Sequence, residues 1–482
     1  MTKVKNPKQK FIGISTISFF VCLAAWSLSS PISSAPDSDY HMSGIWCAWG
    51  SKPGICENQQ VGPTGATAEV TYFVQICEER PITEFKNCDH VTEHPAMQTL
   101  RTSDGSAKNL YYILMRVFAS TNVTMSIVVI RLVSCVLTSF LLFGLLTVAR
   151  GRLLIGAISS ITFILVPNAL VLIPAVTSKS WALIGSLFSW AFLYICVDKS
   201  RKHRDRVIAA AFYGLCVLLV LSTRIDATVF LIFSSALILV RTMKIRSLLF
   251  NTKSRFLLVF SIAVLLAGSR VPRVNGYLTQ LKPQGHGSIA STFLYYFNQI
   301  VESFASCFGY WVPQSGAGPG AAGIVGISFA TFVIGVSLQR QTRQQLLQTT
   351  SILLFVSALI YWGNIVMGPR VPGTYILSLT AFLIGLTVIN ADFGPEFMLA
   401  RRSRVFVISI ISISHWIVLD GRINGFLEPS PPGNIYAPWL DLSFAPLLIL
   451  LMAVLGFFAF LHTLWKLIDL DLRSEQVPEL SS

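Results

Sequence analysis

Two carboxylates and an imidazole follow the first hydrophobic run of the chain, in the stretch Pro-Asp-Ser-Asp-Tyr-His at residues 36–41. Asp37, Asp39 and His41 are each two positions apart. A carboxylate is a general base for a hydroxyl, and a histidine can orient a carboxylate or bind an acceptor. In an extended or turning segment Asp37 and Asp39 point in different directions, so we expect only one of them to reach a reacting centre. The alternative is a helix N-cap and turn, which suit Pro-Asp-Ser-Asp equally well.

Three arginines stand within or at the ends of apolar runs. Arg131 lies inside one run, Arg224 joins two runs beside Asp226, and Arg370 follows Gly-Pro before another. An ionisable group in hydrocarbon costs about 3 kcal/mol unless it is paired or hydrated. The planar, permanently charged fork of arginine suits a phosphate, so the three residues predict a site for a lipid phosphate. Each also has a structural alternative: snorkelling for Arg131, pairing with Asp226 for Arg224, and interfacial anchoring for Arg370.

The elements that position these residues are membrane helices. With 53% hydrophobic and only 12% charged residues, the chain is predicted to be an integral membrane protein. A helix needs roughly 20 apolar residues to cross the bilayer. Twelve spans are predicted, near 11–31, 124–148, 153–174, 179–197, 207–223, 225–240, 256–270, 320–338, 350–368, 372–391, 405–419 and 442–462. The predicted fold class is therefore all-α, one polytopic membrane domain over residues 1–482.

Basic residues gather before the first span and in every second loop after it. The basic loops lie at 150–152, 199–206, 241–255, 340–343 and 401–404. By the positive-inside rule these loops and both termini are cytoplasmic in a multi-pass protein of the plasma membrane. The net charge of +14 is shared among short loops rather than gathered on one surface, which argues against a nucleic-acid partner.

Residues 32–110 form the first predicted extracytoplasmic loop, with ten acidic residues against five basic ones. Four of the nine cysteines lie in it: Cys47, Cys56, Cys77 and Cys88. An even number of cysteines in an oxidising compartment predicts disulfides, most simply 47–56 and 77–88, although three pairings are possible. Zinc is the competing interpretation, but the spacings lack the tight pairs of structural zinc sites.

A second extracytoplasmic loop is predicted over residues 271–319. Its segment 288–307 has the pattern of an amphipathic helix rich in Phe and Tyr. Such a helix lies along the membrane interface and borders a lipid entry path, or it only covers the bundle.

Several short motifs resemble an actinobacterial family of polytopic membrane proteins of unknown function. The motifs are Pro36–His41, Asn109–Tyr112, Val129–Leu132, Leu165–Asn168 with Trp181, Leu219–Arg224, and Pro369-Arg370 with Tyr375. The family in turn resembles the GT-C glycosyltransferases, which take sugars from polyprenyl-phosphate donors and keep an acidic residue in the first outside loop. The family commonly has Asp-Glu after the proline, where this chain has Asp37-Ser38.

The resemblance implies a glycosyltransferase of cell-wall biogenesis. Its donor would be a polyprenyl-phosphate sugar, with decaprenyl-phosphate arabinose the first to test, and its acceptor an envelope glycan or lipid. Asp37 keeps the proline-aspartate context and is preferred as the base over Asp39, and Arg131, Arg224 and Arg370 would hold the leaving phosphate. Two Asp and a His could hold a metal, but a lipid monophosphate donor does not require one, and no cofactor is predicted.

Two other classes of function stay open on the sequence. Twelve spans with both ends inside also fit a transporter or flippase of a lipid-linked sugar, but the two halves show no similarity. The third class is a structural partner of a cell-wall enzyme complex. Turnover of a labelled donor by purified protein separates the first class from the others.

The topology yields a first prediction. Cysteine replacing Gln60 in loop 32–110 should react with a membrane-impermeant thiol reagent in intact cells, whereas cysteine replacing Ser200 should react only after permeabilisation. The reverse pattern would overturn the assignment of the two sides. Mass shifts of the labelled protein provide the measurement.

Overall fold

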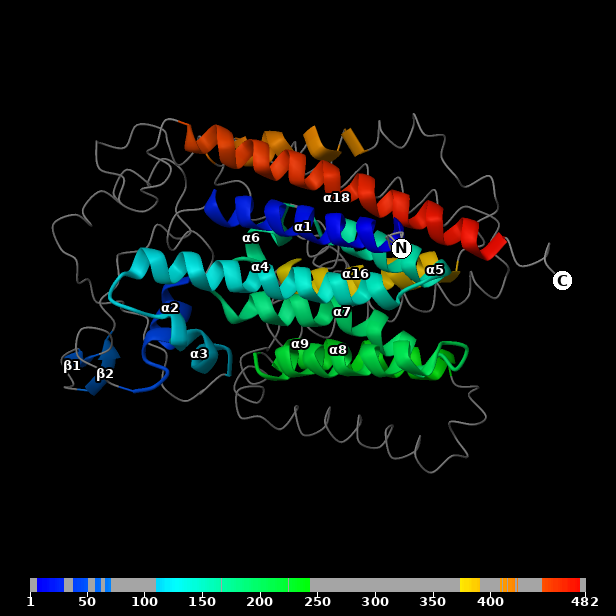
Figure 1. The fold of residues 1–482 in the computed structure, drawn as a ribbon. Helices are drawn as coiled ribbons and strands as arrows, with labels where there is room; N and C mark the ends of the chain where they lie inside the picture. Colours follow the sequence, from blue (N-terminus) through cyan, green and yellow to red (C-terminus); the bar gives the residue numbers. More distant parts are fainter. Residues whose placement is uncertain are drawn as a thin grey trace, which may run out of the picture.

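The structure is a computed structural model. It describes residues 7–29, 38–50, 57–61, 66–70, 110–165, 167–223, 225–242, 373–390, 408–409, 411–413, 415–420, 423 and 444–476. Figure 1 shows long helices lying side by side, with short helices and a hairpin at one end of them. The start of the first helix and the end of the last lie toward the other end.

The first and last described helices run antiparallel along most of their lengths. They are α1 (Pro7–Leu28) and α18 (Ala445–Gln476). Phe19 stacks on Phe460 with ring centroids 4.8 Å apart, and the hydroxyls of Ser15 and Thr463 hydrogen-bond at 2.7 Å. The contact therefore brings together segments that are more than 400 positions apart in the chain.

The remaining long helices pack around α7, whose side chains are mostly buried. These helices are α4 (Val123–Val148), α5 (Gly151–Ile164), α7 (Ser178–Val197), α8 (His203–Leu221), α9 (Ile225–Thr242) and α16 (Gly373–Asn390). Glycines allow the closest crossings: a Cβ on Gly156 of α5 would lie 2.7 Å from the Gly385 carbonyl oxygen of α16. Small residues at such crossings are typical of membrane bundles.

Four helices are long and apolar enough to cross a membrane within the described ranges. They are Pro7–Leu28, Met125–Val148, Ser178–Val197 and Ala445–Leu472. The positions of α8, α9 and α16 also match predicted spans. The spans predicted at 256–270, 320–338 and 350–368, and the loop 271–319, lie outside the described residues, and 405–419 is described only in part. The structure thus supports a polytopic membrane protein but does not test the count of twelve.

The span predicted at 153–174 is wrong as one helix. Helix α5 ends at Ile164 and a separate short helix, α6 (Pro167–Leu172), follows it. Proline lacks the N–H that would continue the ladder and restricts the residue before it, whereas it is favourable in the first turn of a new helix. The break therefore lies where the sequence places Pro167.

The last span was predicted too short. It was expected to end near residue 462, but α18 continues to Gln476. The sequence after Trp465 carries several charged residues. Asp471 is instead buried and pairs with Lys8 at the start of α1, so a packed helix accommodates it.

Short elements cover the end of the bundle at which α1 finishes. They are α2 (Ser38–Trp46), α3 (Leu110–Met115), the 3-10 turn η2 (Arg116–Phe118), and the antiparallel strands β1 (Glu57–Val61) and β2 (Ala66–Val70). The strands pair in the register Glu57 with Val70 and Val61 with Ala66. The all-α prediction is therefore corrected by one hairpin, whose connection, Gly-Pro-Thr-Gly, is turn-forming. We call this region the α2–α3 end.

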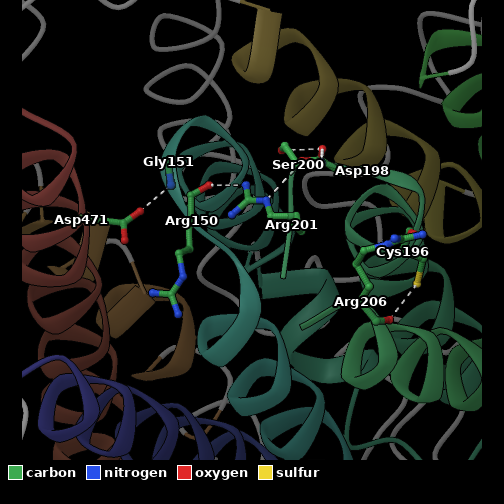
Figure 2. Close-up of polar contacts among 8 residues, drawn as sticks. All are labelled: Arg150, Gly151, Cys196, Asp198, Ser200, Arg201, Arg206 and Asp471. Carbon is green, nitrogen blue, oxygen red and sulfur yellow. Dashed lines mark hydrogen bonds and ion pairs between the residues drawn. The ribbon is translucent and has the colours of Figure 1, made fainter. Parts of the chain in front are cut away.

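The opposite end is closed by polar contacts between loops and both terminal helices. Figure 2 shows Asp471 of α18 accepting a hydrogen bond from the Gly151 backbone N–H, and Arg201 donating to the Arg150 carbonyl oxygen at 3.1 Å and to Asp198 at 3.2 Å. Lys8 Nζ lies 2.6 Å from Asp471 Oδ1. Gly151 has a φ of 56°, a backbone conformation that favours glycine.

These contacts place two of the predicted basic loops, 150–152 and 199–206, at the same end of the bundle as the start of α1 and the end of α18. The described elements that follow α1, namely α2, β1 and β2, lie at the other end, where α3 also packs. The relative sidedness is thus the one that the charge pattern predicts. Which end faces the cytoplasm stays a prediction.

The crossing of α5 and α16 yields a second prediction. Gly156→Ala should lower the thermal unfolding temperature, because overpacking a tight contact costs about 1–3 kcal/mol. Gly214→Ala is the matched control: its Cβ would meet no atom within 4 Å, and alanine favours the helix. Equal unfolding temperatures of the two variants in detergent would contradict this account of the crossing.

Candidate functional site

Helix α2 carries residues 38–41 of the predicted catalytic stretch, and three contacts hold it against the bundle. The His41 Nδ1 atom and the Tyr112 hydroxyl of α3 share a hydrogen bond of 2.6 Å. Gly44 lies so close to the Tyr112 ring that a Cβ there would be 3.1 Å from it. Trp46 Nε1 donates to the Ser120 carbonyl oxygen at 3.1 Å. The helix is therefore fixed at both of its ends.

His41 is buried, with 5% of its surface exposed. The bond to Tyr112 occupies one ring nitrogen and fixes the orientation of the imidazole. This agrees with a positioning role for His41. The acceptor-binding role predicted for it is not tested.

Of the two candidate bases, only Asp39 lies in the described part of the chain. Asp39 lies in the first turn of α2, whose backbone is described, while Asp37 lies outside the described residues. The helix begins at Ser38, so the sequence puts Asp37 immediately before it. This agrees with the helix-cap alternative as well as with catalysis, because an Asp before a helix is a favourable cap.

Aromatic rings pack between α3 and α7. The Tyr111 ring meets the edge of Trp181 at a centroid distance of 5.0 Å and the ring of Tyr112 at 5.7 Å. Tyr111 is fully buried, and burial raises the pKa of its phenol above the ordinary value, so the hydroxyl stays protonated. These ring contacts join helix α3 to the start of α7.

Arg131 is buried rather than snorkelling outward. Only 3% of its surface is exposed, and its guanidinium donates to the Ser27 carbonyl oxygen at 3.0 Å. Ser27 belongs to the last turn of α1, whose carbonyl groups lack partners within the helix. A cation at this place also interacts favourably with the negative end of the helix dipole. Arg131 thus caps α1, which the sequence interpretation did not foresee.

Arg224 and Arg370, the other two predicted phosphate ligands, lie outside the described residues. Cys56, Cys77 and Cys88 do so too. Cys47 takes part in a disulfide, but its partner is outside the described ranges, because Cys22, Cys135, Cys196 and Cys216 are free. The two bridges predicted for the loop stay predictions.

Sequence reasoning missed Arg116 of η2. It is 5% exposed, donates to the Ala119 carbonyl oxygen at 2.9 Å, and lies 5.4 Å from the centre of the Trp49 ring. Burial lowers the pKa of its guanidinium. The signal available was an arginine between a Tyr-Tyr motif and an apolar Val-Phe pair, but the residue stood between the predicted loop and the next span.

Arg116 and Arg131 are both buried. Arg116 belongs to η2 at the α2–α3 end, whereas Arg131 lies in the third turn of α4 and bonds to the last turn of α1, which finishes at that end. Chemically, this arrangement brings two fixed cations, a held imidazole and the helix that bears Asp39 to one end of a membrane bundle. Such a set can bind an anion and position a carboxylate.

Comparison with known proteins adds a family but no activity. A family model described as "Predicted membrane protein (DUF2142)" matches residues 19–367. No curated protein matches the chain, and no solved structure does.

The contact between α2 and α3 yields a third prediction. Tyr112→Phe removes the hydroxyl bonded to buried His41 and should lower the free energy of unfolding by about 1–3 kcal/mol. Tyr194→Phe is the control, because no side-chain hydrogen bond of Tyr194 occurs in the described part of the chain. We expect a lower unfolding temperature for the first variant alone; a parent-like value for Tyr112→Phe would show that this bond does not hold α2.

Proposed function

We propose that this chain, which belongs to the DUF2142 family of predicted membrane proteins, transfers a sugar from a polyprenyl-phosphate donor to an envelope glycan or lipid. The reaction takes place at the α2–α3 end. The proposed enzyme is a GT-C-type glycosyltransferase of the plasma membrane, and decaprenyl-phosphate arabinose is the first donor to test.

The observation that carries the proposal is the joint placement of a carboxylate-bearing helix and buried cations. Helix α2 begins ten residues after α1 ends and packs on the bundle through Tyr112 and Ser120. Arg116 is buried at this end, and Arg131, buried in α4, bonds to the last turn of α1 that leads to it. A site for inverting sugar transfer needs both a base for the acceptor and positive charge for the departing phosphate.

The chemistry follows from these two needs. The acceptor hydroxyl oxygen forms a bond to the anomeric carbon while the bond from that carbon to the phosphate oxygen breaks. The phosphate leaves with the electron pair and is stabilised by guanidinium groups. A carboxylate of Asp37 or Asp39 takes the acceptor proton, and His41, held by Tyr112, positions that carboxylate.

The sidedness supports an extracytoplasmic reaction. The start of α1, the end of α18 and the basic loops 150–152 and 199–206 lie at the end opposite to α2. If the basic loops are cytoplasmic, the proposed site faces outward, where envelope glycans are assembled.

The base yields a fourth prediction. Asp37→Asn should reduce transfer by about 10²–10⁴-fold while donor binding stays close to that of the parent, because the amide keeps the shape but not the basicity. Asp39→Asn should have a smaller effect. Asp198→Asn, at the opposite end, is the control. Labelled polyprenyl-phosphate sugar and purified full-length protein provide the assay.

Three outcomes bear on this prediction. Loss of transfer in Asp39→Asn alone would reverse the roles of the two aspartates. Full transfer in both variants would show that this segment is a helix cap. Movement of labelled lipid across the membrane of proteoliposomes without any sugar transfer would favour the transporter.

In the same assay, Arg224→Ala and Arg370→Ala should weaken donor binding if these arginines hold the phosphate.

A further inference from the structure

Arg116 is a buried cation that has no counter-ion among the described residues. Within the described ranges, no carboxylate forms an ion pair with it, and its Nε atom is buried without a hydrogen-bond partner. Its contacts are one backbone carbonyl oxygen, that of Ala119, and the face of Trp49. An uncompensated buried charge is costly unless an anion neutralises it. The arrangement therefore indicates a missing anionic partner.

The surroundings of Arg116 are apolar and exposed. Large hydrophobic side chains are exposed on residues close to Arg116 in the chain and on Trp49, whose ring lies over the guanidinium; together they are called the patch here, namely Trp49, Leu114, Val117 and Phe118. Val117, which follows Arg116 directly, is 64% exposed. Met125, in the first turn of α4, is also exposed. Exposed apolar and aromatic groups next to a span favour contact with lipid chains.

We propose that Arg116 and this patch form a binding site for a phosphate-bearing lipid. The guanidinium binds the phosphate, and the apolar side chains contact the first part of the hydrocarbon chain. A soluble anion would satisfy the charge but leave the patch exposed, whereas a neutral lipid would cover the patch but leave the charge uncompensated. A phosphate ester of a long apolar chain satisfies both requirements.

Trp49 gives the site a cover. Its ring lies over the guanidinium and is itself largely exposed, so the ring stabilises the cation through its π face when no anion is bound. Its exposure leaves room for the ring to move aside when the phosphate arrives. As a donor site, this assignment rests on the proposed function; as a phosphate-lipid site, it is tested by binding alone.

The test measures binding of labelled undecaprenyl phosphate to the full-length protein in phosphatidylcholine nanodiscs. The parent should bind the phosphate at least about tenfold more tightly than undecaprenol, which has the same chain without the charge. Arg116→Gln should lower the affinity for the phosphate about tenfold or more, because a charge-assisted contact is lost. Arg204→Gln, an exposed arginine at the opposite end, should leave binding unchanged.

A second pair of variants guards against misfolding of Arg116→Gln. Val117→Asp places a negative charge beside Arg116 on an exposed position, and Val117→Asn has the same size without the charge. We expect the Asp variant to bind the phosphate several-fold more weakly than the Asn variant. Equal affinities of these two, or parent-like affinity of folded Arg116→Gln, would overturn the site.

Competition identifies the source of the lipid. If phosphatidylglycerol displaces undecaprenyl phosphate at equal concentration, the site serves membrane phospholipids; if it does not, the site selects the prenyl phosphate. Binding that depends on Arg116 without any sugar transfer would leave this inference standing and count against the proposed function.

Discussion

The contacts of the buried Asp471 carboxylate are the interaction on which the arrangement of the helices depends. The carboxylate accepts from Lys8 at the start of α1 and from the backbone of Gly151 between α4 and α5, and so joins the first helix, the last helix and an internal loop. A charge that is 4% exposed is stable only with such partners, because its desolvation must be offset by pairing and hydrogen bonds. With this end fixed, α1 and α18 stay antiparallel over their lengths.

The two ends of the bundle use charge in opposite ways. At the end closed by Asp471, several charges pair with one another, as Lys8 does with Asp471 and Arg201 with Asp198. At the α2–α3 end, Arg131 is satisfied in part by a helix carbonyl, while Arg116 has one carbonyl and an aromatic face. Charges that are paired with protein groups serve stability. A buried charge without a counter-ion is more often functional, so the end that carries α2 is the better candidate for a functional site.

Part of the candidate site could be predicted from the sequence. The stretch 36–41 stood out because carboxylates and an imidazole follow an apolar run, and α2 does place Asp39 and His41 at the end of the bundle. The partner of His41 could not be predicted, since Tyr112 lies 71 positions away. Arg116 was missed for a related reason: its burial depends on Trp49 and Ala119, and a local pattern of residue types does not reveal which arginine lacks a counter-ion.

The sequence by itself determined the class of protein, the positions of most described helices and their alternating direction, because apolar length and loop charge are local properties that the bilayer reads directly. It also determined the break before Pro167, although the span had been taken as continuous, since proline acts through its own ring. Only the tertiary structure decided the length of α18, the capping of α1 by Arg131 and, within the part of the chain that the structure describes, the lack of a counter-ion for Arg116. Each of these depends on whether a distant segment supplies a partner for a charge. Burying a charge costs desolvation energy, so the presence of that partner decides whether the charged residue can be buried.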